Sequence, residues 1–339
     1  MRRREFIALL GGMATAWPLA AHAQNLDRIR RIAALIPLAI EDPISQARVS
    51  AFMQGLEQLG WADGRNIHIE IRWAAADAFG ARPPDTRSAY AERFRKYAAE
   101  LIALAPDVVV AHSSPAVAAL QEKTSTIPIV FIGVVDPVGA GFVASLARPG
   151  SNTTGFIALD YGLSAKWLEL LKELAPKVTR VAVLRDPSSH VGIGQLAAME
   201  AIAPSLGVEL TPIDERDPGE IERGLKEFAG TANGGLIVTA SVSQGLYRKL
   251  IISLAARHRL PAVYPFGYMI VDGGLISYGT DLVDQYKRTA VYVDRILKGA
   301  KPSELPVQAP VKYELVVNLR TARALGLKLP ASVLAAPTR

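Results

Sequence analysis

Short apolar runs alternate with amphipathic segments along most of this chain. The runs are rich in Val, Ile and Leu, as is typical of strands buried on both faces of a parallel sheet. They lie at residues 32–38, 107–112, 127–134 and 180–185. Between such runs, apolar residues recur at helical spacing, for example Val49, Phe52 and Leu56 in the predicted helix 45–59. Strands that alternate with helices of this length predict an α/β fold with parallel sheets.

The stretch 127–155 organises the rest of the chain. Its predicted strand ends in the polar turn Val135-Asp136-Pro137, and a loop of small residues then leads to a second short strand at 153–159. Open α/β sheets bind ligands at the carboxyl edge of their strands. We therefore interpret this stretch as the end of one lobe and the bridge into another.

The second half repeats the βα rhythm and then returns toward the first. A long amphipathic helix at 281–297 and a strand at 313–319 follow the last βα unit. These elements predict two Rossmann-like lobes joined by a hinge of three crossings, near Gly155, Gly279 and Leu305. Lobe 1 is expected to contain residues 24–157 and 280–305, and lobe 2 residues 158–279 and 306–339.

The first 23 residues have the pattern of an export signal. Arg2, Arg3 and Arg4 precede an apolar segment at 6–19 that is too short to span a bilayer, and Ala21-His22-Ala23 is a small-x-small cleavage site. The mature chain is expected to begin near Gln24 and to reside in the periplasm. The paired arginines leave the twin-arginine and Sec routes both open. No later run predicts a transmembrane helix.

Composition narrows the possible functions further. The chain of 339 residues contains no cysteine, which excludes disulfides, thiolate metal sites and a thiol nucleophile. Its five histidines are scattered, and the formal net charge of +6 is not concentrated in a basic block. Gly139 and Gly141 do not form a nucleotide-binding motif, and no G-x-S-x-G elbow occurs. We therefore expect no metal, cofactor, nucleic-acid partner or catalytic site.

Six ordered segments carry a family resemblance. They are IPIVFIGVVDPVGAGFV, ARPGSNTTG, AARHRLPAVY, GGLISYG, LKGAKPSELPVQ and KYELVVNLRTARALG. Together they resemble the ABC-transporter substrate-binding proteins of the tryptophan/tyrosine-binding type, which are similar to type I periplasmic binding proteins. The resemblance spans residues 32–330. It implies a two-lobed receptor that closes on a small ligand and delivers it to a membrane permease, and some relatives bind aromatic amino acids. The loop 75–88 is longer than the family pattern.

Candidate binding residues in lobe 1 follow predicted strands. Leu38 ends the first strand, and Ser113 and Ser114 stand between a strand and a helix that begins with proline. Their hydroxyls, with the free N–H groups of the helix N-terminus, suit a carboxylate, although a serine there is also a common helix cap. Asp136 suits an ammonium or hydroxyl group, or it caps its own turn.

Candidates in lobe 2 occupy the equivalent places. Asp160 and Tyr161 lie where the chain enters this lobe, and Tyr161 suits stacking or hydrogen bonding to a ligand, or packing at the hinge. Asp281 stands at the return crossing, where it also suits helix capping. The remaining candidates follow lobe 2 strands; they are Asp186, Ser188, Ser241, Ser243, Phe266 and Tyr268.

These observations favour an exported receptor that feeds an ABC import system. The expected ligand is an amino acid or a small aromatic acid, held as the lobes close around it. A sensor that presents its ligand-bound surface to a membrane receptor needs the same cleft and remains an alternative. An exported hydrolase is a weaker alternative, because no nucleophile–base motif is present. The protein is expected to be a monomer.

Overall fold

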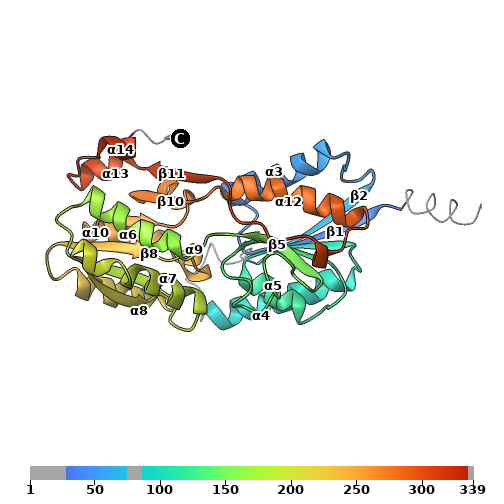
Figure 1. The fold of residues 1–339 in the computed structure, drawn as a ribbon, viewed down its shortest axis with the longest axis horizontal. Coiled ribbons are helices and arrows are strands. Elements are labelled where there is room, and N and C mark those ends of the chain that lie inside the picture. Colours follow the sequence, from blue (N-terminus) through green and yellow to red (C-terminus); the bar gives the residue numbers. More distant parts are fainter. Residues whose placement is uncertain (1–27, 75–85, 335–339) are drawn as a thin grey trace, which may run out of the picture.

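The computed structural model describes residues 28–74 and 86–334, which form two α/β lobes lying side by side (Figure 1). The sheet of lobe 1 has the strand order β2-β1-β3-β4-β5. Its strands are β1 (Arg30–Ile36), β2 (Ile67–Trp73), β3 (Val108–His112), β4 (Ile129–Val134) and β5 (Thr153–Ile157). The helices beside it are α3 (Pro43–Gln58), α4 (Thr86–Ala103), α5 (Ser114–Gln121) and α12 (Leu282–Leu297).

Lobe 2 is built around a sheet with the order β11-β10-β9-β8-β6-β7. Its strands are β6 (Arg180–Arg185), β7 (Glu209–Asp214), β8 (Gly234–Val238), β9 (Ala262–Tyr264), β10 (Ile276–Thr280) and β11 (Tyr313–Val317). Its helices are α6 (Gly162–Leu174), α7 (His190–Glu200), α8 (Pro218–Phe228), α9 (Val242–Leu246), α10 (Arg248–Arg257), α11 (Tyr268–Val271), α13 (Leu319–Ala324) and α14 (Ala331–Leu334). The short 3₁₀ turns are η1 (Ala203–Leu206) and η2 (Pro302–Glu304).

The two lobes share one topology, as the repeated βα rhythm predicted. The order β7-β6-β8-β9-β10 in lobe 2 reproduces the order β2-β1-β3-β4-β5 in lobe 1, and all pairs within these sets are parallel. The prediction of purely parallel sheets needs one correction, because β11 pairs antiparallel with β10. The chain returns from lobe 1 to this open edge, where an antiparallel strand completes the pairing of β10.

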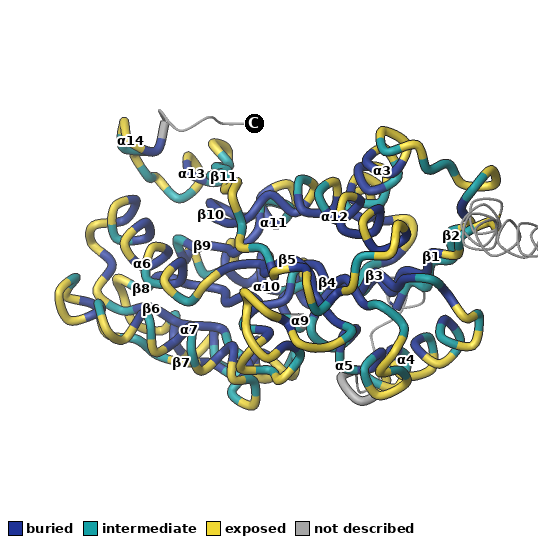
Figure 2. Tube along the Cα trace, turned by 45° about the vertical axis from the view of Figure 1, so that its right-hand side comes forward, coloured by how far each residue is buried: buried dark blue, intermediate teal, exposed yellow. Residues whose placement is uncertain are grey.

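Each sheet is buried on both faces, which explains the nearly continuous apolar runs in the sequence. In lobe 1, one face packs on α4 and α5 and the other on α3 and α12; Figure 2 shows the buried strands inside the more exposed helices. Strand β3 is buried along its whole length. Trp167 on α6 is fully buried in the core of lobe 2.

The helix α3 begins two residues before the predicted segment. Asp42 precedes it and accepts a hydrogen bond from the backbone N–H of Ile44 (3.0 Å), while Pro43 occupies the first helical position. Farther along, Gly55 lies against α12. A Cβ at this position would lie 2.8 Å from the Cβ of Ala290, so the glycine permits the close approach of the two helices.

Three connections join the lobes, as predicted. They are the segments β5–α6, β10–α12 and η2–β11, and Figure 1 shows all of them on the side where α12 meets β10 and β11. Across the first connection, the Tyr161 hydroxyl donates a hydrogen bond to Oδ2 of Asp136 (3.0 Å). Between the second and third, Lys312 Nζ forms an ion pair with Oδ2 of Asp281 (2.7 Å). We retain the lobe boundaries of the sequence analysis as a proposal.

Two predicted features fall outside the described residues. They are the export signal at 1–23 and most of the loop 75–88, of which residues 75–85 are not described. Within ranges 28–74 and 86–334, no helix combines the length and hydropathy needed to cross a membrane. The same ranges hold no group of three or more His, Cys, Asp or Glu side chains placed to bind a metal ion.

Candidate ligand-binding site

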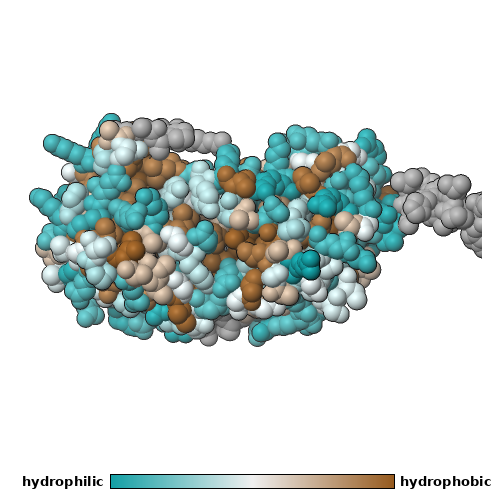
Figure 3. All heavy atoms as spheres, in the orientation of Figure 1, coloured by the Kyte–Doolittle hydropathy of each residue, from teal (hydrophilic) through white to brown (hydrophobic). Residues whose placement is uncertain are grey.

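A cavity of about 450 Å³ lies between the two lobes. Residues at the carboxyl ends of β1, β3 and β4 line it from lobe 1, and residues after β6, β8 and β9 line it from lobe 2. This is the edge at which parallel α/β sheets bind ligands, and its volume is in the range of small-molecule sites. Figure 3 shows polar side chains over most of the outer surface, with apolar residues in separate groups. The cavity is therefore the strongest candidate for a binding site.

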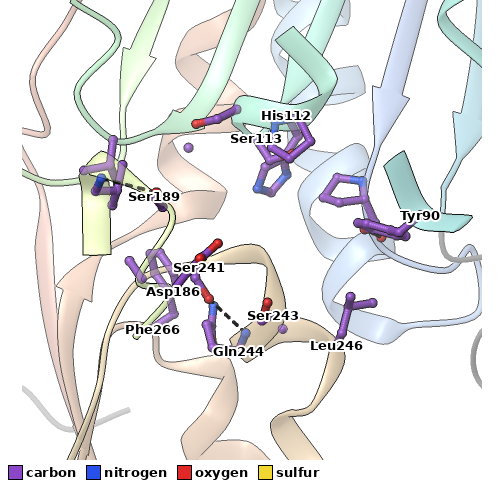
Figure 4. A pocket seen from close by; sticks show the side chains of 18 of the residues that line it. Tyr90, His112, Ser113, Asp186, Ser189, Ser241, Ser243, Gln244, Leu246 and Phe266 are labelled. Carbon is purple, nitrogen blue, oxygen red and sulfur yellow. Dashed lines mark hydrogen bonds between the residues drawn. The ribbon is translucent and has the colours of Figure 1, made fainter. Parts of the chain in front are cut away.

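Eight of the thirteen predicted residues line this cavity. They are Leu38, Ser113, Ser114, Asp186, Ser241, Ser243, Phe266 and Tyr268. Figure 4 shows Ser113 with His112 on the lobe 1 side, and Asp186, Ser241 and Ser243 on the lobe 2 side. The structure thus brings together residues that lie more than 150 positions apart in the chain.

Ser113 differs from an ordinary helix cap. It occupies the N-cap position of α5, but its side chain makes no capping hydrogen bond, and its buried Oγ has no partner within the described residues. Its backbone has φ 89° and ψ 156°, a region that is nearly reserved for glycine and that costs about 1–3 kcal/mol. The purely structural interpretation of this serine as a cap therefore fails. Ser113 therefore presents an uncommitted hydroxyl, held under strain, at the cavity wall.

The lobe 2 serines, by contrast, organise their own loops. Ser241 Oγ accepts a hydrogen bond from the backbone N–H of Gln244 (3.0 Å), which caps α9 and is drawn in Figure 4. Ser188 donates hydrogen bonds from its N–H (2.9 Å) and its hydroxyl (2.7 Å) to Oδ1 of Asp186. Asp186 is 7% exposed and is held in place at the cavity wall by this turn.

Five predicted residues lie outside the cavity lining. They are Asp136, Asp160, Tyr161, Ser188 and Asp281. Local hydrogen bonds engage their polar groups: Asp136 Oδ1 accepts from Gly139 N (2.8 Å), and Asp160 Oδ1 accepts from Leu163 N (3.2 Å). Asp281 caps α12 through Asp284 N (3.0 Å), and the ion pair with Lys312 helps to lower the pKa of its carboxyl against the opposing effect of burial. The capping alternatives given for Asp136 and Asp281 describe those two residues in this conformation.

Sequence reasoning missed seven polar side chains of the cavity wall; they are Arg48, Tyr90, His112, Ser189, Arg216, Gln244 and Tyr247. His112 ends β3, one residue before the serine that was predicted. Its Nδ1 shares a hydrogen bond with the Tyr286 hydroxyl (2.7 Å). Burial, and secondarily the charge of Arg48, lowers the pKa of His112 well below its ordinary value, so this ring is neutral at pH 7. A buried apolar strand that ends in histidine was the signal available in the sequence.

Gly133 on β4 creates the room for this histidine. Its φ is +69°, and a Cβ there would lie 3.0 Å from Nε2 of His112. Tyr90 on α4 donates its hydroxyl to the carbonyl of Pro37 (2.6 Å), which holds the end of β1 beside the cavity. These contacts fix the position of the lobe 1 wall, and none of them involves the side chain of a predicted binding residue.

The lobe 2 wall presents an aromatic surface with a polar tip. The rings of Phe266 and Tyr268 stack at 5.8 Å between centroids and 12° between planes. Gln244 Nε2 donates to the Tyr268 hydroxyl (2.8 Å), so that hydroxyl remains able to donate its own proton. Burial raises the pKa of Tyr268, which keeps the phenol protonated. Such a wall suits the apolar body of a ligand with a hydrogen-bonding group beside it.

A buried ion-pair cluster joins the lobes at one end of this site. Arg248 at the start of α10 contacts Oδ2 of Asp42 with NH1 (2.8 Å) and Oδ2 of Asp272 with Nε (2.6 Å). Asp42 belongs to lobe 1, whereas both other residues belong to lobe 2. The side chains of Arg248 and Asp42 are 7% and 3% exposed. This contact is available only when the lobes are close together.

Comparisons with solved structures agree with the two-lobed fold. A conserved domain protein from Vibrio cholerae has a TM-score of 0.80 and 25% identity, covering 92% of this chain and all of that one. An ABC domain from Streptococcus pneumoniae, in complex with L-Trp, has a TM-score of 0.80 and 23% identity, covering 91% of this chain and 99% of that one. A ligand-free, open substrate-binding protein from Clostridium difficile has a TM-score of 0.66 and 24% identity, covering 89% of this chain and 97% of that one. The fold is thus that of type I periplasmic binding proteins, as the resemblance implied.

Comparisons of sequence identify the family. A curated tyrosine-binding protein from Clostridioides difficile (strain R20291) is 25% identical over 289 residues, which cover 85% of this chain and 79% of that protein. The model of the ABC transporter substrate-binding protein family matches residues 33–339. The cleft between two parallel-sheet lobes and this match over nearly the whole chain lead to one conclusion: the protein belongs to the ABC transporter substrate-binding protein family.

Proposed function

We propose that this protein is an exported receptor that captures one small organic ligand between its lobes and delivers it to the permease of an ABC importer. The favoured ligand is an amino acid or a small aromatic acid. The cavity at the carboxyl edges of both sheets carries this proposal, because it combines stacked aromatic rings with the unpartnered Ser113 hydroxyl. The tyrosine-binding relative and the neighbour bound to L-Trp support the same ligand class.

The proposed mechanism is closure of the lobes on the ligand. The structure has a TM-score of 0.80 with the Trp-bound neighbour and 0.66 with the ligand-free, open one, although the identities are nearly equal. The buried contact between Arg248 and Asp42 also supports a closed arrangement. A ligand that contacts both walls binds the closed form better and so shifts the equilibrium toward it. A permease then distinguishes the loaded receptor from the empty one by this shape.

Location and assembly follow from the same proposal. Export through the signal at residues 1–23, by the Sec or the twin-arginine route, would place the mature chain in the periplasm as a monomer. Non-covalent capture requires no cofactor and no catalytic step, and the hydroxyls and aromatic rings of the cavity suit this task.

The test is a thermal-shift and calorimetric screen of the chain from Gln24 onward. Aromatic amino acids, aromatic acids, other amino acids and small metabolites are the panel. A ligand at 100 times its dissociation constant stabilises the protein by about 2.7 kcal/mol, an easily measured shift. Binding with one ligand per chain, weakened by Ser113→Ala, is expected. Failure of every amino acid and aromatic acid to bind would contradict the proposed ligand class, and turnover of any ligand would contradict the receptor role.

A further inference from the structure

Arg48 is a buried cation that faces the cavity without an acidic partner among the residues that the structure describes. It lies on α3, is 4% exposed and contributes to the cavity wall. Among residues 28–74 and 86–334, no carboxylate lies within ion-pair distance of it and no side-chain hydrogen bond forms to it; its buried Nε is unpartnered. Guanidinium groups stay charged in proteins, and a buried, unpaired charge is costly. The charge therefore calls for a partner that the described part of the chain does not supply.

The acid on the same helix, Asp42, already has other partners. Asp42 stands at the start of the same helix, but Oδ1 accepts from Ile44 N (3.0 Å) and Oδ2 contacts NH1 of Arg248 (2.8 Å). Burial lowers the pKa of Arg48, and the charge of Asp42 only partly opposes this effect. Arg48 lies beside the Tyr268 ring, with its centroid 5.3 Å from Cζ, and beside the neutral His112, while the like charge of Arg248 lowers the pKa of Arg48 further.

Two hydroxyl groups near Arg48 in the cavity wall are also available to donate hydrogen bonds to a negatively charged group. Ser113 Oγ is buried without a partner among the described residues, and it occupies the N-cap position of α5, whose first residues Ser114 and Pro115 line the cavity. The Tyr268 hydroxyl accepts from Gln244 and has its proton left to donate. Among the described lining residues, Asp186 is the one acid, and its Oδ1 already accepts two hydrogen bonds from Ser188.

We propose that Arg48 binds the carboxylate of the ligand, and that this receptor selects an apolar, aromatic-sized body carrying a free carboxylate. The inference rests on the proposed receptor function and specifies the chemistry of its site. A planar carboxylate accepts two parallel hydrogen bonds from a guanidinium, which gives both strength and orientation. The cation lies on lobe 1 but stacks on Tyr268 of lobe 2, so a carboxylate bound there neutralises a charge that the two lobes bury together. Ligand binding thereby favours closure.

The first test compares ligands that differ only in this group. The probes are 3-phenylpropionate and 3-phenylpropanamide, and phenylalanine and phenylalaninamide, measured by calorimetry. We expect each carboxylate to bind about 10- to 100-fold more tightly than its amide, the range of a charge-assisted hydrogen-bonded contact. Arg48→Gln should abolish this preference. The matched control is Arg180→Gln, because Arg180 stacks on the Phe228 ring (4.6 Å) away from the cavity, and it should keep the preference.

Equal affinity for acid and amide, or a preference that survives in Arg48→Gln, would overturn the inference and leave the receptor function standing.

A second readout, the unfolding midpoint, needs no ligand. Arg48→Met removes the uncompensated charge from the empty protein, so its unfolding midpoint should rise, whereas Arg180→Met should not raise it. If no probe binds, these phenyl compounds are excluded as ligands, and a higher midpoint for Arg48→Met still supports an anion site. A lower midpoint would show that the guanidinium is a structural element and would overturn it.

Discussion

Two buried arginines flank the same aromatic ring at the junction of the lobes, and their surroundings differ. The Cζ atoms of Arg48 and Arg248 lie 5.3 and 5.8 Å from the Tyr268 centroid. Arg248 is surrounded by the carboxylates of Asp42 and Asp272, whereas Arg48 has no such neighbour within the described residues. One arginine thus holds the lobes together with groups of the protein itself, and the other leaves its partner to be supplied by the ligand.

The largest effect is expected from removing the charge of Asp42. Asp42→Asn keeps a side chain that caps α3 but takes one carboxylate from the buried Arg248. Breaking a buried ion pair from one side costs about 3 kcal/mol or more. We expect a loss of that size in the free energy of unfolding, together with a larger radius of gyration in small-angle scattering as the lobes separate.

Asp272→Asn is the matched control for that experiment. Its side chain is 24% exposed and belongs to the same lobe as Arg248, so its loss should cost less and should not separate the lobes. Equal effects of the two substitutions on stability and shape would show that Asp42 does not join the lobes, and the contrast between the arginines would fail.

The neutral state of His112 predicts sensitivity to acid. The pKa of His112 is depressed in the folded protein. The unfolded chain therefore binds a proton at this residue near pH 6.5, whereas the folded chain does not. This contribution to stability is complete above that pH and declines below it, by on the order of 1 kcal/mol per pH unit. Urea denaturation between pH 8 and 5 should show the decline, and His112→Asn should reduce it. The same slope in both proteins would argue against a buried neutral ring beside Arg48.

Strain at Ser113 is expected to trade stability against binding. Glycine adopts φ 89° without strain, so Ser113→Gly should raise the free energy of unfolding by about 1 kcal/mol. The same substitution should weaken binding, because the ligand loses a hydroxyl contact. Ser241→Gly is the control, since Ser241 has φ −148° and caps α9 through the N–H of Gln244. This substitution should lower stability slightly. A destabilised Ser113→Gly protein would indicate that the hydroxyl has a structural partner.

The smallest effect concerns an ion pair that water reaches. Lys312 is 50% exposed and pairs with Asp281 between two of the connecting segments. Exposed pairs contribute about 0.2–1 kcal/mol and weaken in salt. Lys312→Met should therefore lower stability by about half a kilocalorie per mole, and 1 M NaCl should reduce the difference. A loss as large as that for Asp42→Asn would remove the distinction between buried and exposed pairs at the hinge.

The sequence predicted much of the cavity wall because parallel strands deliver their carboxyl ends to one edge. Ser113, Asp186 and Ser241, which line the cavity, follow strands and were predicted from this rule without any knowledge of which strands are neighbours; the family resemblance added support for Ser113. The rule also included Asp136 and Asp160, which follow strands but turn back to their own backbone N–H groups. Strand order does not distinguish a carboxylate that faces a ligand from one that caps a turn.

Arg48 could not be found in this way. It lies within an amphipathic helix, where an arginine between apolar residues normally marks the solvent side. In the folded protein α12 packs on α3, and Tyr268 approaches Arg48 from lobe 2. No local pattern contains this information, because the burying groups lie more than 200 residues away.

The sequence by itself determined the βα alternation, the two lobes and the strand ends that line the cavity, since these depend on short-range periodicity and on local turn chemistry. The family came from the resemblance of six ordered segments. The tertiary structure alone decided which charges are compensated. Compensation depends on distances between groups from different lobes, such as Arg248 and Asp42. Those distances are set when both cores pack and the lobes approach, and they leave Arg48 as the charge that a ligand must satisfy.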